Sequence, residues 1–253
     1  MFIDTHCHLD FPQFNQDRSQ VIERARAEGI EYVINIGSSV KGSIDSLGLS
    51  KEYDFIYASV GIHPHEADNF DEKSENSIRQ LAKKEKVVAI GEIGLDYFKN
   101  YSKLENQKPL FISMLKLAKE LDKPVVIHSR QAQNDTLKII KESMPLKGVV
   151  HCFSGDVDFL KAFLDLGFFV SFTCNITYKN ANNLRAIVKE TPLEKLLLET
   201  DAPYLAPEGL RGARNEPAFI KLLAEEVAKI KEVSMEEVAR ATTANAKLFF
   251  NLK

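Results

Sequence analysis

Short apolar runs recur along the whole of this 253-residue chain, and segments with the spacing of amphipathic helices lie between them. The clearest helical segment places Leu110, Met114, Ala118 and Leu121 on one face. Each apolar run is continuous rather than alternating, which is typical of strands in a parallel sheet that helices cover on both sides. The eight runs are Phe2-Ile3, Tyr32–Ile36, Phe55–Val60, Val87–Ile90, Val125–Ile127, Val149-Val150, Phe168–Phe172 and Leu196–Leu198.

This pattern predicts an α/β fold, a (β/α)8 TIM barrel, because eight β/α units in about 250 residues match that architecture in size and count. A doubly wound open sheet is the alternative, since periodicity alone does not show closure. We expect Pro109 at the start of a helix and Pro124 just after its end. No linker or repeat indicates a second domain, so one domain over 1–253 is expected.

Composition excludes several functional classes. The formal net charge is −3, so there is no global basic field and any contact with nucleic acid must be local. The longest uncharged run, Leu166 to Tyr178, is shorter than the roughly 20 apolar residues of a membrane helix, so no membrane association is expected. The odd number of cysteines, Cys7, Cys152 and Cys174, and an N-terminus without a secretory pattern predict a cytoplasmic protein.

The histidines all lie at the ends of predicted strands or just beyond them. They are His6, His8, His63, His65, His128 and His151. His6 and His8 are two residues apart on one strand, so their imidazoles share a face while Cys7 points the other way. Two imidazoles on one face of a strand are typical of a metal site.

Two carboxylates occupy equivalent positions. Glu92 follows the run that begins at Val87, and Asp201 follows the last run. In a barrel these side chains and the histidines converge on the C-terminal face of the strands, where active sites of this fold lie. Imidazole and carboxylate groups suit Mg, Mn or Zn, and a carboxylate between two imidazole groups can bridge two metals about 3.5–4 Å apart. The residues therefore predict a dinuclear site with two divalent metal ions per chain.

Seven short motifs carry a resemblance to a known family. They are Thr5-His6-Cys7-His8-Leu9-Asp10, Gly61-Ile62-His63-Pro64-His65, Gly91-Glu92-Ile93-Gly94-Leu95-Asp96-Tyr97, His128-Ser129-Arg130, His151-Cys152-Phe153-Ser154-Gly155, Glu199-Thr200-Asp201-Ala202-Pro203-Tyr204 and Arg214-Asn215-Glu216-Pro217. In this order they resemble the TatD family of metal-dependent hydrolases, within the wider amidohydrolase-like superfamily. The resemblance implies a barrel with a dinuclear centre and deoxyribonuclease activity. It also implies one metal on His6, His8 and Asp201, a second on His128 and His151, and Glu92 as the bridge.

The remaining assignments concern catalysis and substrate. Asp201 is assigned to orienting and deprotonating the attacking water, and the catalytic candidates are Asp201, Glu92 and His63. His63, His65 and Arg130 are the substrate-binding candidates, as donors to phosphate oxygens or to the leaving group. The family often has an acidic residue after its His-Ser-Arg triplet, whereas Gln131 stands here, which leaves open whether Arg130 is paired or free for phosphate.

Two further segments have alternative interpretations. Tyr97-Phe98-Lys99-Asn100-Tyr101 and Tyr178-Lys179 place aromatic rings beside basic groups, which either stack nucleobases or pack their own loops. Arg214 either fastens the loop after the last strand together with Glu216 or contacts substrate directly.

The leading functional hypothesis is a phosphodiesterase that degrades DNA, a 3′-5′ exonuclease on single strands, with the direction implied by the resemblance alone. DNA is the expected partner, and a monomer or weak oligomer is expected. The alternative is an amidohydrolase or esterase acting on a cyclic amide, a lactone or an aminoacyl ester. Glu92 disfavours it, because related dinuclear amidohydrolases often have a modified lysine at that place. A catalytically silent binding protein is the third hypothesis, and the intact ligand set disfavours it.

Overall fold

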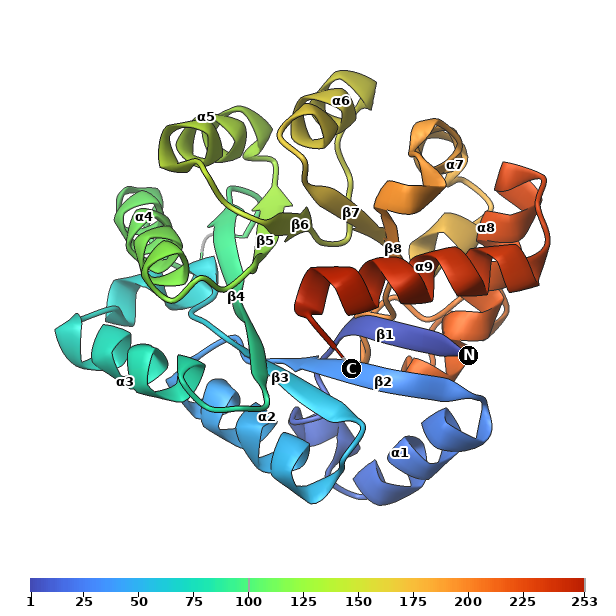
Figure 1. The fold of residues 1–253 in the computed structure, drawn as a ribbon, viewed down its shortest axis with the longest axis horizontal. Coiled ribbons are helices and arrows are strands. Elements are labelled where there is room, and N and C mark those ends of the chain that lie inside the picture. Colours follow the sequence, from blue (N-terminus) through green and yellow to red (C-terminus); the bar gives the residue numbers. More distant parts are fainter. Residues whose placement is uncertain (100, 253) are drawn as a thin grey trace.

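The structure is a computed structural model that describes residues 1–99 and 101–252. Eight parallel strands lie side by side in chain order and form the inner wall of the molecule, with helices outside them (Figure 1). The strands are β1 (Phe2–Cys7), β2 (Ile30–Ile36), β3 (Ile56–Val60), β4 (Val87–Asp96), β5 (Val125–Arg130), β6 (Gly148–Val150), β7 (Phe169–Phe172) and β8 (Leu196–Leu198). Each of the eight predicted runs overlaps one of these strands.

The first and last strands of the sheet meet and close the barrel. The Thr5 hydroxyl donates to the carbonyl of Leu198 at 3.0 Å. Beyond the strands, the Asp201 N–H donates to the carbonyl of His6 at 2.9 Å, and the His8 N–H donates to that of Ala202 at 2.8 Å. This closure and the sequential strand order confirm the (β/α)8 barrel and rule out the doubly wound sheet, whose first strand lies inside the sheet.

Most helices follow a strand and cover the outside of the barrel, whereas α9 lies across one end of it (Figure 1). They are α1 (Arg18–Ala27), α2 (Val40–Glu52), α3 (Glu72–Ala82), α4 (Leu104–Glu120), α5 (Gln133–Ser143), α6 (Val157–Asp165), α7 (Asn182–Glu190), α8 (Ile220–Lys231) and α9 (Met235–Phe250). No helix among residues 1–99 and 101–252 has the length and apolar character needed to cross a membrane.

The expected start of α4 at Pro109 was wrong, because the helix begins at Leu104. The extra turn is held by tertiary hydrogen bonds. The Gln107 side chain accepts from the Asp96 N–H at 2.9 Å and donates to the Asp96 carbonyl at 3.1 Å. Asn106 donates to Asp68 at 2.8 Å. These contacts stabilise the turn before the proline, although Pro109 has no N–H to donate to the turn below it.

One end of the barrel is closed by apolar side chains. Ala246, Phe249 and Phe250 of α9 pack against Ile3, Val88 and Phe169, which lie at or near the N-terminal ends of their strands. The polar side chains of the candidate site follow the opposite, C-terminal ends. The fold therefore separates a closed apolar end from an end that is free to carry chemistry.

Strand β4 extends further than the predicted run, from Val87 to Asp96, so Glu92 lies inside a fully buried strand. Gly94, with φ +145, lies opposite His128 in the ladder with β5. A Cβ atom at Gly94 would lie 2.0 Å from the His128 carbonyl oxygen. Glycine is required here because only it allows β4 to approach His128 this closely.

Candidate metal centre

The end of β1 presents two imidazoles to the same point. His6 and His8 bring their Nε2 atoms within 3.2 Å of each other. Between them, the Cys7 thiol lies on the other side of the strand, 3.9 Å from the Ile34 carbonyl. His8 donates its Nδ1 hydrogen to the Ile36 carbonyl at 3.0 Å, so its Nε2 keeps a free lone pair. The predicted shared face of His6 and His8 is confirmed.

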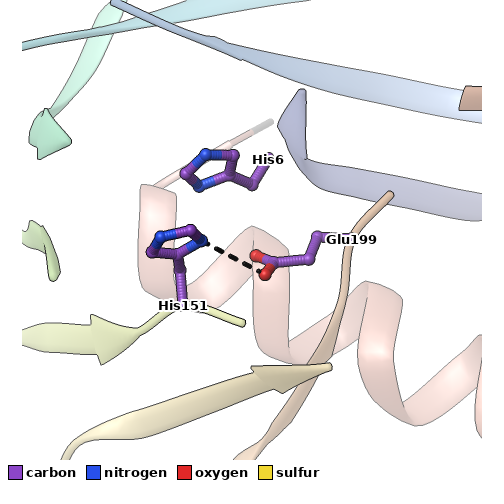
Figure 2. A group of neighbouring side chains, drawn as sticks. All are labelled: His6, His151 and Glu199. Atoms are coloured by element: carbon purple, nitrogen blue, oxygen red, sulfur yellow. Dashed lines mark ion pairs between the residues drawn. The ribbon is translucent and has the colours of Figure 1, made fainter. Parts of the chain in front are cut away.

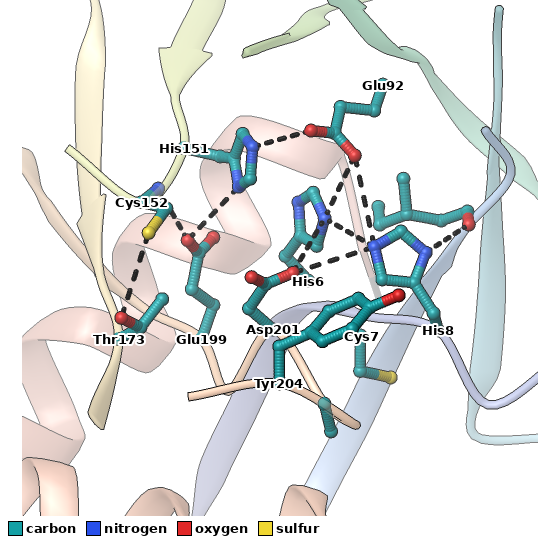
Figure 3. Close-up of polar contacts among 12 residues, drawn as sticks. His6, Cys7, His8, Glu92, His151, Cys152, Thr173, Glu199, Asp201 and Tyr204 are labelled. Carbon is teal, nitrogen blue, oxygen red and sulfur yellow. Dashed lines mark hydrogen bonds and ion pairs between the residues drawn. The ribbon is translucent and has the colours of Figure 1, made fainter. Parts of the chain in front are cut away.

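Two carboxylates complete a first group of donors around these nitrogens (Figure 3). Asp201 Oδ1 lies 3.7 Å from His6 Nε2 and 3.6 Å from His8 Nε2. Glu92 Oε2 lies 3.5 Å and 3.9 Å from the same two nitrogens. Asp201 has a left-handed backbone, with φ 55, which is uncommon for a residue other than glycine and typical of functional sites.

The other oxygen of Glu92 faces a second group of donors. Its Oε1 lies 2.8 Å from His128 Nδ1 and 2.7 Å from His151 Nε2, and these two nitrogens are 3.2 Å apart. His63 Nε2 lies 3.5 Å from the same oxygen. The two oxygens of one buried carboxylate therefore face two separate groups of nitrogens.

The two groups touch through their rings. The imidazoles of His6 and His151 stack with centroids 4.1 Å apart and an angle of 12° between planes. Figure 2 shows this pair with Glu199, whose Oε1 lies 3.4 Å from Nδ1 of His151. Glu199 also accepts from the Cys152 N–H at 2.6 Å and from the Ser171 hydroxyl at 2.7 Å, so it is fixed in place.

A second carboxylate, Asp96, forms a hydrogen bond with His128. Its Oδ2 accepts from Nε2 of His128 at 3.3 Å and from Nε2 of His65 at 2.8 Å. With the Nε2 hydrogen directed at Asp96, Nδ1 of His128 presents its lone pair to Glu92. Sequence reasoning gave no role to Asp96 or Glu199, although each is a carboxylate within four residues of a predicted ligand and lies inside a quoted motif.

The electrostatics of the centre favour a bound cation. Burial alone would raise the pKa of Glu92, but the neighbouring imidazoles of His151, His63 and His128 lower it well below its usual value. Burial opposes protonation of His151, yet Glu92 and Glu199 raise its pKa well above the ordinary value. These directions show that the cluster stabilises positive charge between its carboxylates and imidazoles.

A divalent metal would supply such a charge. The donors are the nitrogens and oxygens that Zn, Mn and Mg accept, and partners hold the ligand-ready tautomers of His8 and His128. Nδ1 of His6 and Nδ1 of His151 are buried without a hydrogen-bond partner. Among the described residues, donor groups that could hold a metal ion include His6 with His8 and Glu92, and His63 with Glu92 and His128.

His63 differs from the other histidines in its tautomer. Its Nδ1 accepts the backbone N–H of His65 at 3.1 Å, so in the neutral ring the hydrogen is on Nε2, the atom that faces Glu92. Burial lowers the pKa of His63 to about 4, which keeps the ring neutral at pH 7. In this tautomer Nε2 of His63 is a hydrogen-bond donor, so within the group of His63, Glu92 and His128 only the last two would offer lone pairs to a metal.

Arg130 is exposed at the end of β5, and its guanidinium lies 4.0 Å from the centre of the Phe98 ring. Asp135, the next acidic residue along the chain, binds the Tyr97 hydroxyl at 2.7 Å and Lys108 at 2.8 Å. Among the described residues Arg130 has no ion pair, which answers the question raised by Gln131.

Arg214 fastens the loop after β8, as one of the two interpretations predicts. Its guanidinium donates to both carboxylate oxygens of Asp17 at 2.7 Å. The neighbouring Glu216 accepts from Arg24 of α1 at 2.7 Å, and Asn215 donates to the carbonyls of Thr200 and Tyr204. The alternative of a direct substrate contact is disfavoured, because the donors of Arg214 are engaged away from the centre.

Several known proteins are similar to this chain in sequence or in fold. The family model described as TatD related DNase matches residues 3–251. An uncharacterized metal-dependent hydrolase, YabD of Bacillus subtilis, is 41% identical, with 100% of both chains covered. A protein of Rahnella sp. named 3′-5′ ssDNA/RNA exonuclease TatD is 37% identical, covering 97% of this chain and 96% of its own. The crystal structure of YjjV, a TatD homolog from Escherichia coli, has a TM-score of 0.94 at 34% identity, covering 100% of this chain and 98% of its own.

Proposed function

The chain belongs to the family of TatD-related DNases, which are metal-dependent hydrolases, and we propose that it hydrolyses phosphodiester bonds of single-stranded DNA from the 3′ end. The observation that carries the proposal is the position of Glu92. One of its oxygens faces His6 and His8, and the other faces His128 and His151. Such a donor set suits two divalent ions, and two ions suit phosphoryl transfer.

The first ion would bind His6, His8 and Asp201, the second would bind His128 and His151, and Glu92 would bridge them. Bound divalent ions would lower the pKa of water and offset negative charge on the phosphate oxygens. Two hydrogen bonds hold ligands in place for this role. His8 donates to the Ile36 carbonyl, and His128 donates to the Asp96 carboxylate. Such outer partners fix the tautomer and the orientation of each ring.

Asp201 is the proposed acceptor of the proton from the attacking water. Burial would raise its pKa, but the hydrogen bond to His8 and the charges of His6 and His8 lower it, so the carboxylate is ionised at neutral pH. Its side chain is 15% exposed, three times as much as that of Glu92 at 5%, so water reaches it more readily. A carboxylate at the edge of the site can accept a proton there.

His63 is the proposed donor to the phosphate or to the leaving group. Its Nε2–H is directed into the centre, and its Nδ1 is occupied by the His65 N–H. A neutral imidazole that keeps its hydrogen at pH 7 can stabilise a developing oxyanion through a hydrogen bond. Arg130 and His65 are proposed to contact the phosphate next to the scissile one, because both lie at the rim beyond His128.

The test is degradation of single-stranded oligonucleotides labelled at the 3′ or the 5′ end. The metal-stripped protein receives Mg, Mn or Zn, and Asp201→Ala is assayed beside it. The proposal predicts metal-dependent shortening from the 3′ end that the variant loses. Turnover of lactones or cyclic amides without any shortening of oligonucleotides would contradict it and favour a hydrolase of small substrates.

A further inference from the structure

An exposed aromatic ring lies two residues after Asp96, the carboxylate that holds His128. The ring is that of Phe98, which follows β4 and has 47% of its surface exposed, unusual for a phenylalanine. One of its faces carries the guanidinium of Arg130, at 4.0 Å from the ring centre. Lys99 Nζ lies 5.6 Å from the same ring centre. The Phe98 ring and the cationic groups of Arg130 and Lys99 thus form an amphipathic platform.

The platform is tied rigidly to the metal centre through Asp96. Oδ1 of Asp96 accepts the backbone N–H groups of Phe98 and Lys99 at 2.9 Å and 2.8 Å. Its Oδ2 holds His128 and His65. A single buried carboxylate therefore holds both the backbone of Phe98 and a histidine that faces Glu92.

The other partner of the platform is fixed by the sheet. Arg130 lies opposite Asp96 in the β4–β5 ladder, and the Tyr97 N–H donates to the Arg130 carbonyl at 2.9 Å. The Arg130 side chain makes no ion pair among the described residues, so its N–H groups are available to a ligand. Tyr101, 66% exposed, stands edge-on to His65 with centroids 4.8 Å apart.

Packing of the loop does not account for this arrangement. A ring that serves only to pack its loop is buried against the scaffold, as Phe153 is at 1% exposure. Phe98 and Tyr101 instead keep much of their surface in water, although Asp96 holds the Phe98 backbone in place. Exposed rings beside unpaired cationic groups are the elements that bind single-stranded nucleic acid, with bases on the rings and phosphates on the cations.

We propose that the Phe98–Arg130 pair is a nucleotide subsite, in which Phe98 stacks one nucleobase and Arg130 binds the adjoining phosphate. The inference rests on the proposed function, because it requires a single-stranded polynucleotide in the centre. It adds a residue that selects nucleic acid over small esters, since a small ester has no base to place on Phe98. Stacking tolerates every base, so the subsite recognises single strands without reading their sequence.

The test combines a change in the protein with a change in the substrate. Values of kcat/KM are measured for a single-stranded oligonucleotide and for versions with one abasic residue at successive positions near the 3′ end. In the wild type, loss of the stacked base at one position lowers kcat/KM by about 5- to 140-fold, the range expected for base–aromatic stacking. In Phe98→Ala the intact oligonucleotide loses the same factor, and the abasic residue causes no further loss. Phe98→Tyr restores the wild-type pattern.

Arg26→Ala is the matched control. The Arg26 guanidinium lies 4.5 Å from the centre of the Phe55 ring, the same type of stack, but Phe55 precedes β3 at the opposite end of the barrel. We expect wild-type kinetics on every substrate. Bound metal is measured in all variants, so that a loss caused by Phe98→Ala cannot come from a damaged centre.

An abasic penalty in Phe98→Ala equal to that in the wild type at every position would overturn the subsite and leave the nuclease intact. If instead the wild type shortens no oligonucleotide with any metal, the proposed function fails and the subsite fails with it. The abasic comparison can be made only if the wild type shortens oligonucleotides. Failure of the subsite is therefore distinguishable from failure of the proposed function.

Discussion

Nε2 of His128 donates a hydrogen bond to Oδ2 of Asp96 at 3.3 Å, on the side of the ring away from Glu92. This contact fixes which nitrogen of His128 offers a lone pair to the centre. Removing this hydrogen bond replaces no predicted ligand, but it leaves the His128 ring free to rotate and to change its tautomer. The same carboxylate holds His65 and the backbone of Phe98, so its loss reaches both the centre and its rim.

Asp96→Asn is therefore expected to weaken metal binding at the second group about 10- to 100-fold, the usual cost of losing an outer partner of a ligand. Calorimetric titration of the metal-stripped protein with Mn measures this loss. Asp135→Asn is the control, because Asp135 is a nearby carboxylate that binds Tyr97 and Lys108 and not the centre. Equal Mn affinity in the two variants would show that Asp96 does not orient His128.

His63 and His128 are expected to differ in what their replacement costs. His63→Gln is expected to keep the metal content and to lower kcat by about 100- to 10,000-fold, because a donor is lost and no ligand is. His128→Gln is expected to lose metal as well as activity. Elemental analysis of both purified variants separates the roles, and metal loss in His63→Gln would make His63 a ligand.

Gly94→Ala is expected to displace His128 and to destabilise the fold, because its Cβ would lie 2.0 Å from the His128 carbonyl oxygen. The cost is about 1–3 kcal/mol of unfolding free energy, as for overpacking of a dense core. Urea denaturation measures it. Gly48→Ala in α2, where a Cβ meets no atom within 4 Å, is expected to be neutral or stabilising. Equal stability of the two variants would contradict the close approach of β4 and β5.

Binding of single-stranded DNA is expected to depend only weakly on salt. The net charge is −3, and the cationic groups placed at the rim here are few, chiefly Arg130 and Lys99. Contacts with about three phosphates give a slope of log K against log salt near −2 for a single strand. Fluorescence anisotropy between low and moderate salt measures the slope. A slope near −7, as for about ten phosphates, would mean that a much larger basic track binds the DNA.

The sequence was most informative for features that follow from hydrophobic periodicity and from the position of a residue at the end of a strand. The eight apolar runs and the histidines that follow them predicted the barrel and the convergence of His6, His8, His128 and His151 on one end. Closure needed the contacts of Thr5 with Leu198 and of His6 with Asp201, which no local pattern contains. The start of α4 was wrong for the same reason, because Gln107 binds Asp96 across the fold.

The finer chemistry of the centre also depended on tertiary contacts. The tautomer of His63 follows from a turn in which the His65 N–H reaches Nδ1. The roles of Asp96 and Glu199 follow from the distance of each carboxylate to the far nitrogen of a histidine. Sequence spacing gives residue types at strand ends but not which atom of a ring faces inward.

The most direct test of the central claim, that Glu92 bridges two ions, is anomalous X-ray diffraction from crystals of the Mn-loaded protein. We predict two anomalous peaks about 3.5–4 Å apart. One would lie next to Oε2 of Glu92, close to His6 and His8, and the other next to Oε1, close to His128 and His151. A single peak, or a pair that does not share Glu92, would contradict it.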